Sequence, residues 1–202
     1  YNYLGGVFVE KYACDYNDIP YELLDGKIFY MSPRPAINHN KALSNIFSIF
    51  YNYLKGKDCI PFSDGVDVFL DDKNNVIPDV MIVCDPSIIK EDGIYGVPDL
   101  IVEVLSPTTA NNDRGYKKSL YIKYKVKEYW IVDINSKAVE VYLLKNDALE
   151  LNNIYSIYPE YLVNKMSEQE LKKIPKTFKT SLFDDLIINI EDVFYRIQWK
   201  NW

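Results

Sequence analysis

The hydrophobic and polar positions of the chain follow two periods, one typical of helices and one typical of strands. Apolar residues recur at helical spacing from about 40 to 54, and Asn38 or Asn40 is the expected N-cap of this helix. A second helix is expected from 114 to about 125 with Asp113 as its N-cap. A weak surface helix is expected at 161–173 and a short one at 191–197. Apolar runs predict strands at 21–30 (a hairpin turning at Asp25-Gly26), 65–70, 78–84, 99–105, 128–134, 138–144 and 181–190, with a turn at 71–75.

The order of these elements predicts an α/β fold with a central mixed β-sheet flanked by helices, an N-terminal hairpin and a C-terminal strand and helix extension. At 202 residues the chain is expected to form a single domain, with its core at about 38–145. No apolar run approaches the roughly 20 residues of a membrane span, so no membrane association is expected.

The numbers and positions of cysteine and histidine limit the kinds of metal site that the chain can form. The three cysteines, Cys14, Cys59 and Cys84, are scattered and contain no C-x-x-C motif, which favours the reducing cytoplasm and makes Cys84 an ordinary core residue. His39 is the single histidine, so a histidine-rich metal cluster is excluded. A metal ion would have to be held mainly by carboxylates, which are typical ligands of magnesium, manganese or calcium.

Two carboxylates interrupt strands that otherwise read as buried. Asp79 follows Pro78 at the start of one strand, and Glu103 lies between Val102 and Val104 in another. Burying an ionised carboxylate costs several kcal/mol unless a cation or a donor compensates it. If the strands are neighbours, about 4.8 Å apart, the two side chains can share one cation. The alternatives are a strand-edge aspartate at 79 and a solvated strand face at 103.

A basic stretch follows these acids closely. Between 114 and 127 the chain has six positive residues and no acid, within a protein of net charge −6. Such a stretch suits contact with nucleic-acid phosphates, and a solvated helix face is the alternative. Lys117 lies in the first turn of the expected helix, with Tyr121 four residues later on the same face. The six positive residues are Arg114, Lys117, Lys118, Lys123, Lys125 and Lys127.

Several of these segments together resemble a known family. They are Pro78-Asp79, the run from Pro98 to Pro107 with its Glu-Val-Leu-Ser-Pro block, Asp113 with Lys117 and Tyr121, and the run from Lys127 to Asp133. This combination is similar to the Uma-two family of restriction endonucleases, within the PD-(D/E)XK nuclease superfamily, over residues 20–195. The likeness implies a restriction-endonuclease-like core in which Asp79 and Glu103 bind metal and Lys117 is the catalytic lysine. Leu105 stands where the superfamily's E-x-K pattern has its lysine, so Lys117 must reach the site from the next helix.

The same resemblance suggests Glu22 as a further acid near the metal, with an exposed hairpin acid as the equal alternative. His39 is expected to be structural, at the start of a helix and near the rim of the site, and Asp113 is expected to be a cap. The resulting hypothesis is a Mg- or Mn-dependent endonuclease that hydrolyses DNA as a homodimer in the cytoplasm. In it the Val104 carbonyl completes the metal site, and Arg114, Lys118 and Lys123 contact DNA. The alternatives are a catalytically weak module that binds nucleic acid or a partner, and a small-molecule phosphatase.

Overall fold

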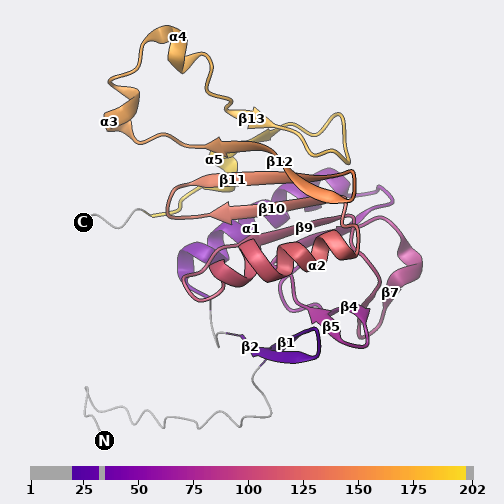
Figure 1. Cartoon of the computed structure of the whole chain (residues 1–202). Coiled ribbons are helices and arrows are strands. Elements are labelled where there is room, and N and C mark those ends of the chain that lie inside the picture. Colours follow the sequence, from indigo (N-terminus) through magenta and orange to yellow (C-terminus); the bar gives the residue numbers. More distant parts are fainter. Residues whose placement is uncertain (1–19, 32–34, 199–202) are drawn as a thin grey trace, which may run out of the picture.

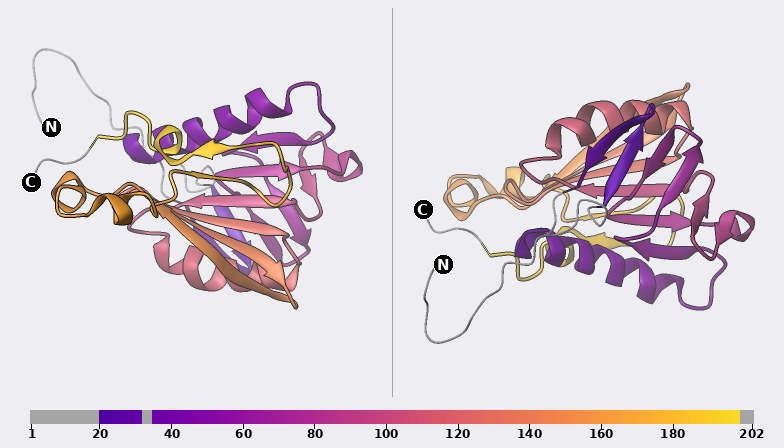
Figure 2. Two further views of the ribbon diagram at one scale, coloured as in Figure 1. Left: turned by 90° about the horizontal axis from the view of Figure 1, so that it is seen from above. Right: turned by 90° about the horizontal axis from the view of Figure 1, so that it is seen from below.

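The computed structural model describes residues 20–31 and 35–198, so Cys14 lies outside the described residues. Its centre is a six-stranded sheet in the order β12-β11-β10-β9-β6-β3. Strands β9 and β10 are parallel and all other neighbours are antiparallel, so the sheet is mixed. With helices on both sides of this sheet, the predicted α/β fold class is confirmed (Figures 1 and 2). The strands are β3 (Ile60–Ser63), β6 (Val80–Val83), β9 (Leu100–Val104), β10 (Glu128–Asp133), β11 (Ala138–Lys145) and β12 (Ala148–Ser156).

A second six-stranded sheet, in the order β2-β1-β5-β4-β8-β7, contains the N-terminal hairpin. The hairpin pairs as the Asp25-Gly26 turn predicts. The expected turn at 71–75 is wrong in part, because Asn74 and Asn75 belong to a strand. Asn74 is buried there because its side chain accepts from the Asp25 N–H at 2.9 Å and donates to Asp71 at 2.8 Å. The strands are β1 (Tyr21–Leu24), β2 (Lys27–Tyr30), β4 (Val68–Asp71), β5 (Asn74–Val76), β7 (Ile89–Lys90) and β8 (Gly93–Tyr95).

The two faces of the central sheet bury separate hydrophobic clusters. Helix α1 (Ile37–Leu54) and helix α5 (Ile190–Val193) cover one face, where Phe50 packs against Trp130. Helix α2 (Lys118–Lys123) and the second sheet cover the other face, where Tyr121 and Tyr129 are fully buried. The alternation along β9 therefore sends Ile101 and Glu103 towards α2, and Val102 and Val104 towards α1.

The helix starts differ from the expectation. Helix α1 begins after Ala36, which has no side chain able to cap it, and Asn38 instead bonds the main chain at Gln198. A π-helical turn, η3 (Asn112–Lys117), precedes α2, so Asp113 lies inside the helical segment and is buried rather than capping its start. The cap predictions at Asn38, Asn40 and Asp113 are therefore wrong: Asn38 bonds the main chain of Gln198, Asn40 lies inside α1, and Asp113 pairs with Lys117.

The C-terminal third also departs from the sequence pattern. The polar segment after 148 forms the long strand β12, which a register shift at Val141/Tyr142 bends. The expected helix at 161–173 is two short helices, α3 (Glu160–Val163) and α4 (Glu168–Leu171). In place of one strand at 181–190 there are β13 (Thr177–Phe178) and β14 (Ile188–Asn189), because the Thr180 hydroxyl accepts two backbone N–H groups and turns the chain.

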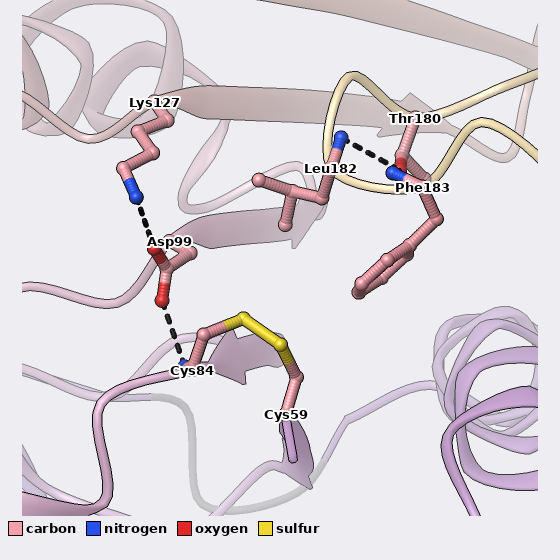
Figure 3. The surroundings of a disulfide bond; sticks show 7 residues. All are labelled: Cys59, Cys84, Asp99, Lys127, Thr180, Leu182 and Phe183. Atoms are coloured by element: carbon pink, nitrogen blue, oxygen red, sulfur yellow. Dashed lines mark hydrogen bonds and ion pairs between the residues drawn. A yellow bond between two sulfur atoms is a disulfide. The ribbon is translucent and has the colours of Figure 1, made fainter. Parts of the chain in front are cut away.

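Cys84 is not a free core cysteine, because it forms a disulfide with Cys59 (Figure 3). The two residues adjoin the Ile60–Val83 pair of β3 and β6, so they face each other across the strands. Asp99 accepts the Cys84 N–H at 2.8 Å and pairs with Lys127 at 2.6 Å. Among the described residues, no helix is both long and apolar enough to cross a membrane.

Candidate active site

Strands β6 and β9 bring Asp79 and Glu103 to the same end of the central sheet. Val80 pairs with Val102 in the antiparallel register, so Asp79 and Glu103 both lie at the end of the strand pair where β6 begins and β9 ends. The Asp79 Oδ2 accepts the Val104 N–H at 2.7 Å, which fixes the carboxylate against the end of β9. The Glu103 side chain is 4% exposed and that of Asp79 is 15% exposed. The two acids predicted from the strands thus lie at the same, partly open end of the central sheet.

Lys117 reaches this edge from the π-helical turn before α2. Its Nζ lies 3.0 Å from the Glu103 Oε1, and the Tyr121 hydroxyl donates to the same oxygen at 2.7 Å. The Lys117 Nζ also lies 3.7 Å from the Asp113 Oδ1. Leu105 occupies the position at which the E-x-K pattern has its lysine. Lys117, from the helical turn, therefore supplies the positive charge beside Glu103.

Glu22 enters the site from the hairpin of the second sheet. Its Oε1 lies 2.7 Å from the Lys117 Nζ and accepts the Ile77 N–H at 3.0 Å. The residue is buried, so the alternative of an exposed hairpin acid is wrong. Because this oxygen already serves two donors, Glu22 holds Lys117 in place.

His39 touches the opposite side of Asp79. Its Nε2 lies 3.3 Å from the Asp79 Oδ2, and the Val104 carbonyl lies beside the ring. Burial lowers the pKa of His39, but the hydrogen bond and charge of Asp79 and the Val104 carbonyl outweigh it, so the pKa is raised overall. The Nδ1 is buried without a hydrogen-bond partner among the described residues. His39 thus contacts a site carboxylate directly.

Asp64 is a site neighbour that the sequence interpretation missed. Its N–H donates to the Asp79 main-chain oxygen at 2.9 Å, and its side chain is exposed. Partial desolvation and the charge of Asp79 raise the pKa of Asp64. Asp64 directly precedes the strand expected at 65–70, and nothing in this local sequence points to Asp79.

Carboxyl groups outnumber basic groups at this end of the sheet. Burial raises the pKa of Glu103 well above its usual range, with Lys117 opposing and the charges of Asp113, Asp79 and Glu22 adding. Burial also raises the pKa of Asp113, again opposed by Lys117. Four carboxylates gather around one lysine and one histidine, so a further cation would be stabilised here.

The donor set fits a hard divalent cation. In residues 20–31 and 35–198, no three histidine, cysteine, aspartate or glutamate side chains are arranged to enclose a metal by themselves. The ligands expected from the sequence are the Asp79 and Glu103 carboxylates and the Val104 carbonyl. Magnesium characteristically binds through one or two carboxylates and keeps several waters, so this sparse oxygen set suits it, whereas the set is too small for a closed protein cage.

Most positive residues of the 114–127 stretch pair with acids from other parts of the chain. Lys118 is different: it lies over the Tyr142 ring, 3.7 Å from the ring centroid, and burial lowers its pKa. The acidic partners are Glu140 for Arg114 at 2.5 Å, Asp71 for Lys123 at 4.0 Å, Asp147 for Lys125 at 3.1 Å and Asp99 for Lys127 at 2.6 Å. The sequence did not reveal these partners because they come from distant strands and turns.

Comparison with known proteins places the chain in a family. The family model of Uma2, described as "Putative restriction endonuclease", matches residues 8–167. The chain belongs to this family. An uncharacterised protein of Synechocystis is 36% identical over 129 residues, which are 63% of this chain and 67% of that protein. The resemblance to the Uma-two family is thereby confirmed.

A solved structure shares the fold. The crystal structure of "a putative nuclease belonging to DUF820" from Anabaena variabilis superposes with a TM-score of 0.64 at 19% identity, covering 86% of this chain and 89% of that one. At this identity the match shows the fold, and the fold of this chain is the restriction-endonuclease-like one. Family membership supports a nuclease that hydrolyses phosphodiester bonds.

Proposed function

We propose that the protein is a divalent-metal-dependent endonuclease that hydrolyses DNA, with magnesium or manganese as its cofactor. The observation that carries the proposal is the excess of carboxylates at the end of β6 and β9, around a single buried lysine. A metal-free phosphate site would instead need an excess of cations. The family supports the reaction class.

Asp79, Glu103 and the Val104 carbonyl would hold the metal. A metal bound there lowers the pKa of a coordinated water and offsets charge on the scissile phosphate. Lys117 is held charged beside Glu103 and can donate to a phosphate oxygen or orient the attacking water. Tyr121 fixes the Glu103 carboxylate, and His39 with the Val104 N–H fixes that of Asp79. Glu22 and Asp113 keep the ammonium group of Lys117 at the edge of the site.

The proposal includes a cytoplasmic homodimer, although the Cys59–Cys84 disulfide removes the cysteine argument for a reducing compartment. Cutting both strands of a duplex requires two active sites, and two-fold dimers are the commonest oligomers. Exposed tyrosines such as Tyr30, at 63%, and Tyr195, at 58%, suit an interface. Light scattering at micromolar concentration should give twice the mass of the chain; a monomer would contradict the dimer and would predict nicking instead of double-strand cleavage.

A cleavage assay tests the function. Supercoiled and linear DNA are incubated with the purified chain and magnesium or manganese, beside Asp79→Asn. The matched control is Asp99→Asn, at the opposite end of the same strand pair. The wild-type and the control should cut, and Asp79→Asn should not. DNA binding without cleavage by the wild-type would favour the binding module, and hydrolysis of p-nitrophenyl phosphate alone would favour the phosphatase.

A further inference from the structure

Residues 157–176 form an arm between β12 and β13 that carries the short helices α3 and α4. Figures 1 and 2 show the arm extending away from the central sheet, beyond the same end of the molecule at which α1 begins. Helix α4 starts with a capping box, in which the Ser167 side chain accepts the Glu170 N–H and the Glu170 carboxylate accepts the Ser167 N–H. The arm thus has local order of its own.

The strand directions place the root of the arm beside the candidate active site. Strand β9 is parallel to β10, and β12 is related to β10 by two antiparallel steps, so β9 and β12 end at the same edge of the sheet. In register, Glu103 aligns through Ile131 and Glu140 with Ile154. Strands β9 and β12 are three strand spacings of about 4.8 Å apart, so the arm leaves the sheet roughly 14 Å from the strand that carries Glu103.

The charges of the arm differ from those of the 114–127 stretch. The arm has four lysines, and none of them has an acidic partner within 4 Å among residues 20–31 and 35–198. Its acids are Glu160, Glu168 and Glu170, and Glu170 is occupied by the capping box. From 171 to 179 the chain has four lysines and no acid, although the net charge of the protein is −6. The lysines of the arm are Lys165, Lys172, Lys173 and Lys176.

From this juxtaposition we propose that the arm binds the phosphate backbone of the DNA substrate beside the cleavage site. The inference rests on the proposed DNA cleavage. An acidic protein repels a polyanion, so its contact with DNA requires positive charge that is not already neutralised. The lysines of the arm meet this requirement, whereas Arg114, Lys123, Lys125 and Lys127 face carboxylates. The arm also emerges from the edge at which a scissile phosphate would have to lie.

The test compares DNA affinity and its dependence on salt. Lys172→Gln with Lys173→Gln is the arm variant. Lys55→Gln with Lys145→Gln is the control, because both lysines are exposed and Lys145 ends β11 at the opposite edge of the sheet. Binding of a labelled DNA duplex is followed by fluorescence anisotropy with calcium in place of magnesium, from 50 to 300 mM salt. Circular dichroism checks that each variant is folded.

The arm variant should bind roughly tenfold or more weakly at 100 mM salt, with a salt slope smaller by about 2, because each lost phosphate contact removes about 0.9. The control should bind as the wild-type does. Equal affinity and slope for the arm variant, with DNA binding and cleavage by the wild-type intact, would overturn the arm proposal alone. The same titration is repeated with a labelled RNA duplex. If the arm variant loses affinity for the RNA duplex but not for the DNA duplex, the assignment of the arm to DNA is wrong. A wild-type protein that neither binds nor cuts DNA would contradict both proposals.

Discussion

The Glu22 Oε1 lies 2.7 Å from the Lys117 Nζ, closer than the 3.0 Å between Lys117 and Glu103. One residue comes from the hairpin of the second sheet and the other from the helical turn that covers the central sheet. Burial lowers the pKa of Lys117, but the charges of Glu103, Glu22 and Asp113 outweigh it and raise the pKa, so the ammonium group stays charged at neutral pH. The hairpin is therefore part of the site.

Replacing Glu22 tests this link. Glu22→Gln keeps the shape and an oxygen for the Ile77 N–H but removes the charge opposite Lys117. Because Glu103 and Asp113 still face the lysine, we expect a loss of about 1–3 kcal/mol in the free energy of unfolding, measured by urea denaturation at pH 7. Glu91→Gln, at an exposed position, should change it by less than about 0.5 kcal/mol. Equal unfolding midpoints for the two variants would contradict the role of Glu22.

Reducing the disulfide should destabilise the fold. Cys59 and Cys84 are 25 residues apart, and loop-closure entropy assigns up to about 3.5 kcal/mol to such a crosslink. Dithiothreitol should therefore lower the melting temperature of the wild-type and of Cys14→Ser, but not that of the double variant Cys59→Ser with Cys84→Ser. If the wild-type purified without reductant shows three titratable thiols, the crosslink is absent from the protein.

Glu128 should make stability depend on pH. Burial raises its pKa, and the hydrogen bonds from Ser181 and Trp130 offset this only in part. A raised folded-state pKa favours the protonated fold, so this contribution is complete below about pH 4.3 and is lost as pH rises through the folded-state pKa. The stability advantage of wild-type over Glu128→Gln should thus shrink from pH 4.5 to 7.5 in urea denaturation, while that over Glu150→Gln stays flat. An advantage that grows with pH would refute this.

Local patterns were sufficient for the hairpin at Asp25-Gly26 and for the two strands that carry Asp79 and Glu103. They work there because turn chemistry and the period of two are properties of neighbouring residues. Strand β12 was missed because its outer edge is exposed and its sequence is polar. Contacts between residues that local patterns do not connect could not be predicted from the sequence either. Asp113 pairs with Lys117 instead of capping a helix, and the Asp64 N–H donates to the main-chain oxygen of Asp79.

Manganese binding tests the central claim most directly, because it needs no assumption about the substrate. Free manganese is measured by electron paramagnetic resonance while the metal is titrated into wild-type, Asp79→Asn and the control Asp99→Asn. Mutating residues that only hydrogen-bond to metal ligands already weakens metal affinity by about 10–100-fold. The loss of a ligand itself should therefore weaken manganese binding by at least roughly tenfold. We predict that wild-type and Asp99→Asn bind the metal alike and that Asp79→Asn loses it. Equal manganese affinity in all three proteins would contradict a metal site at Asp79 and Glu103.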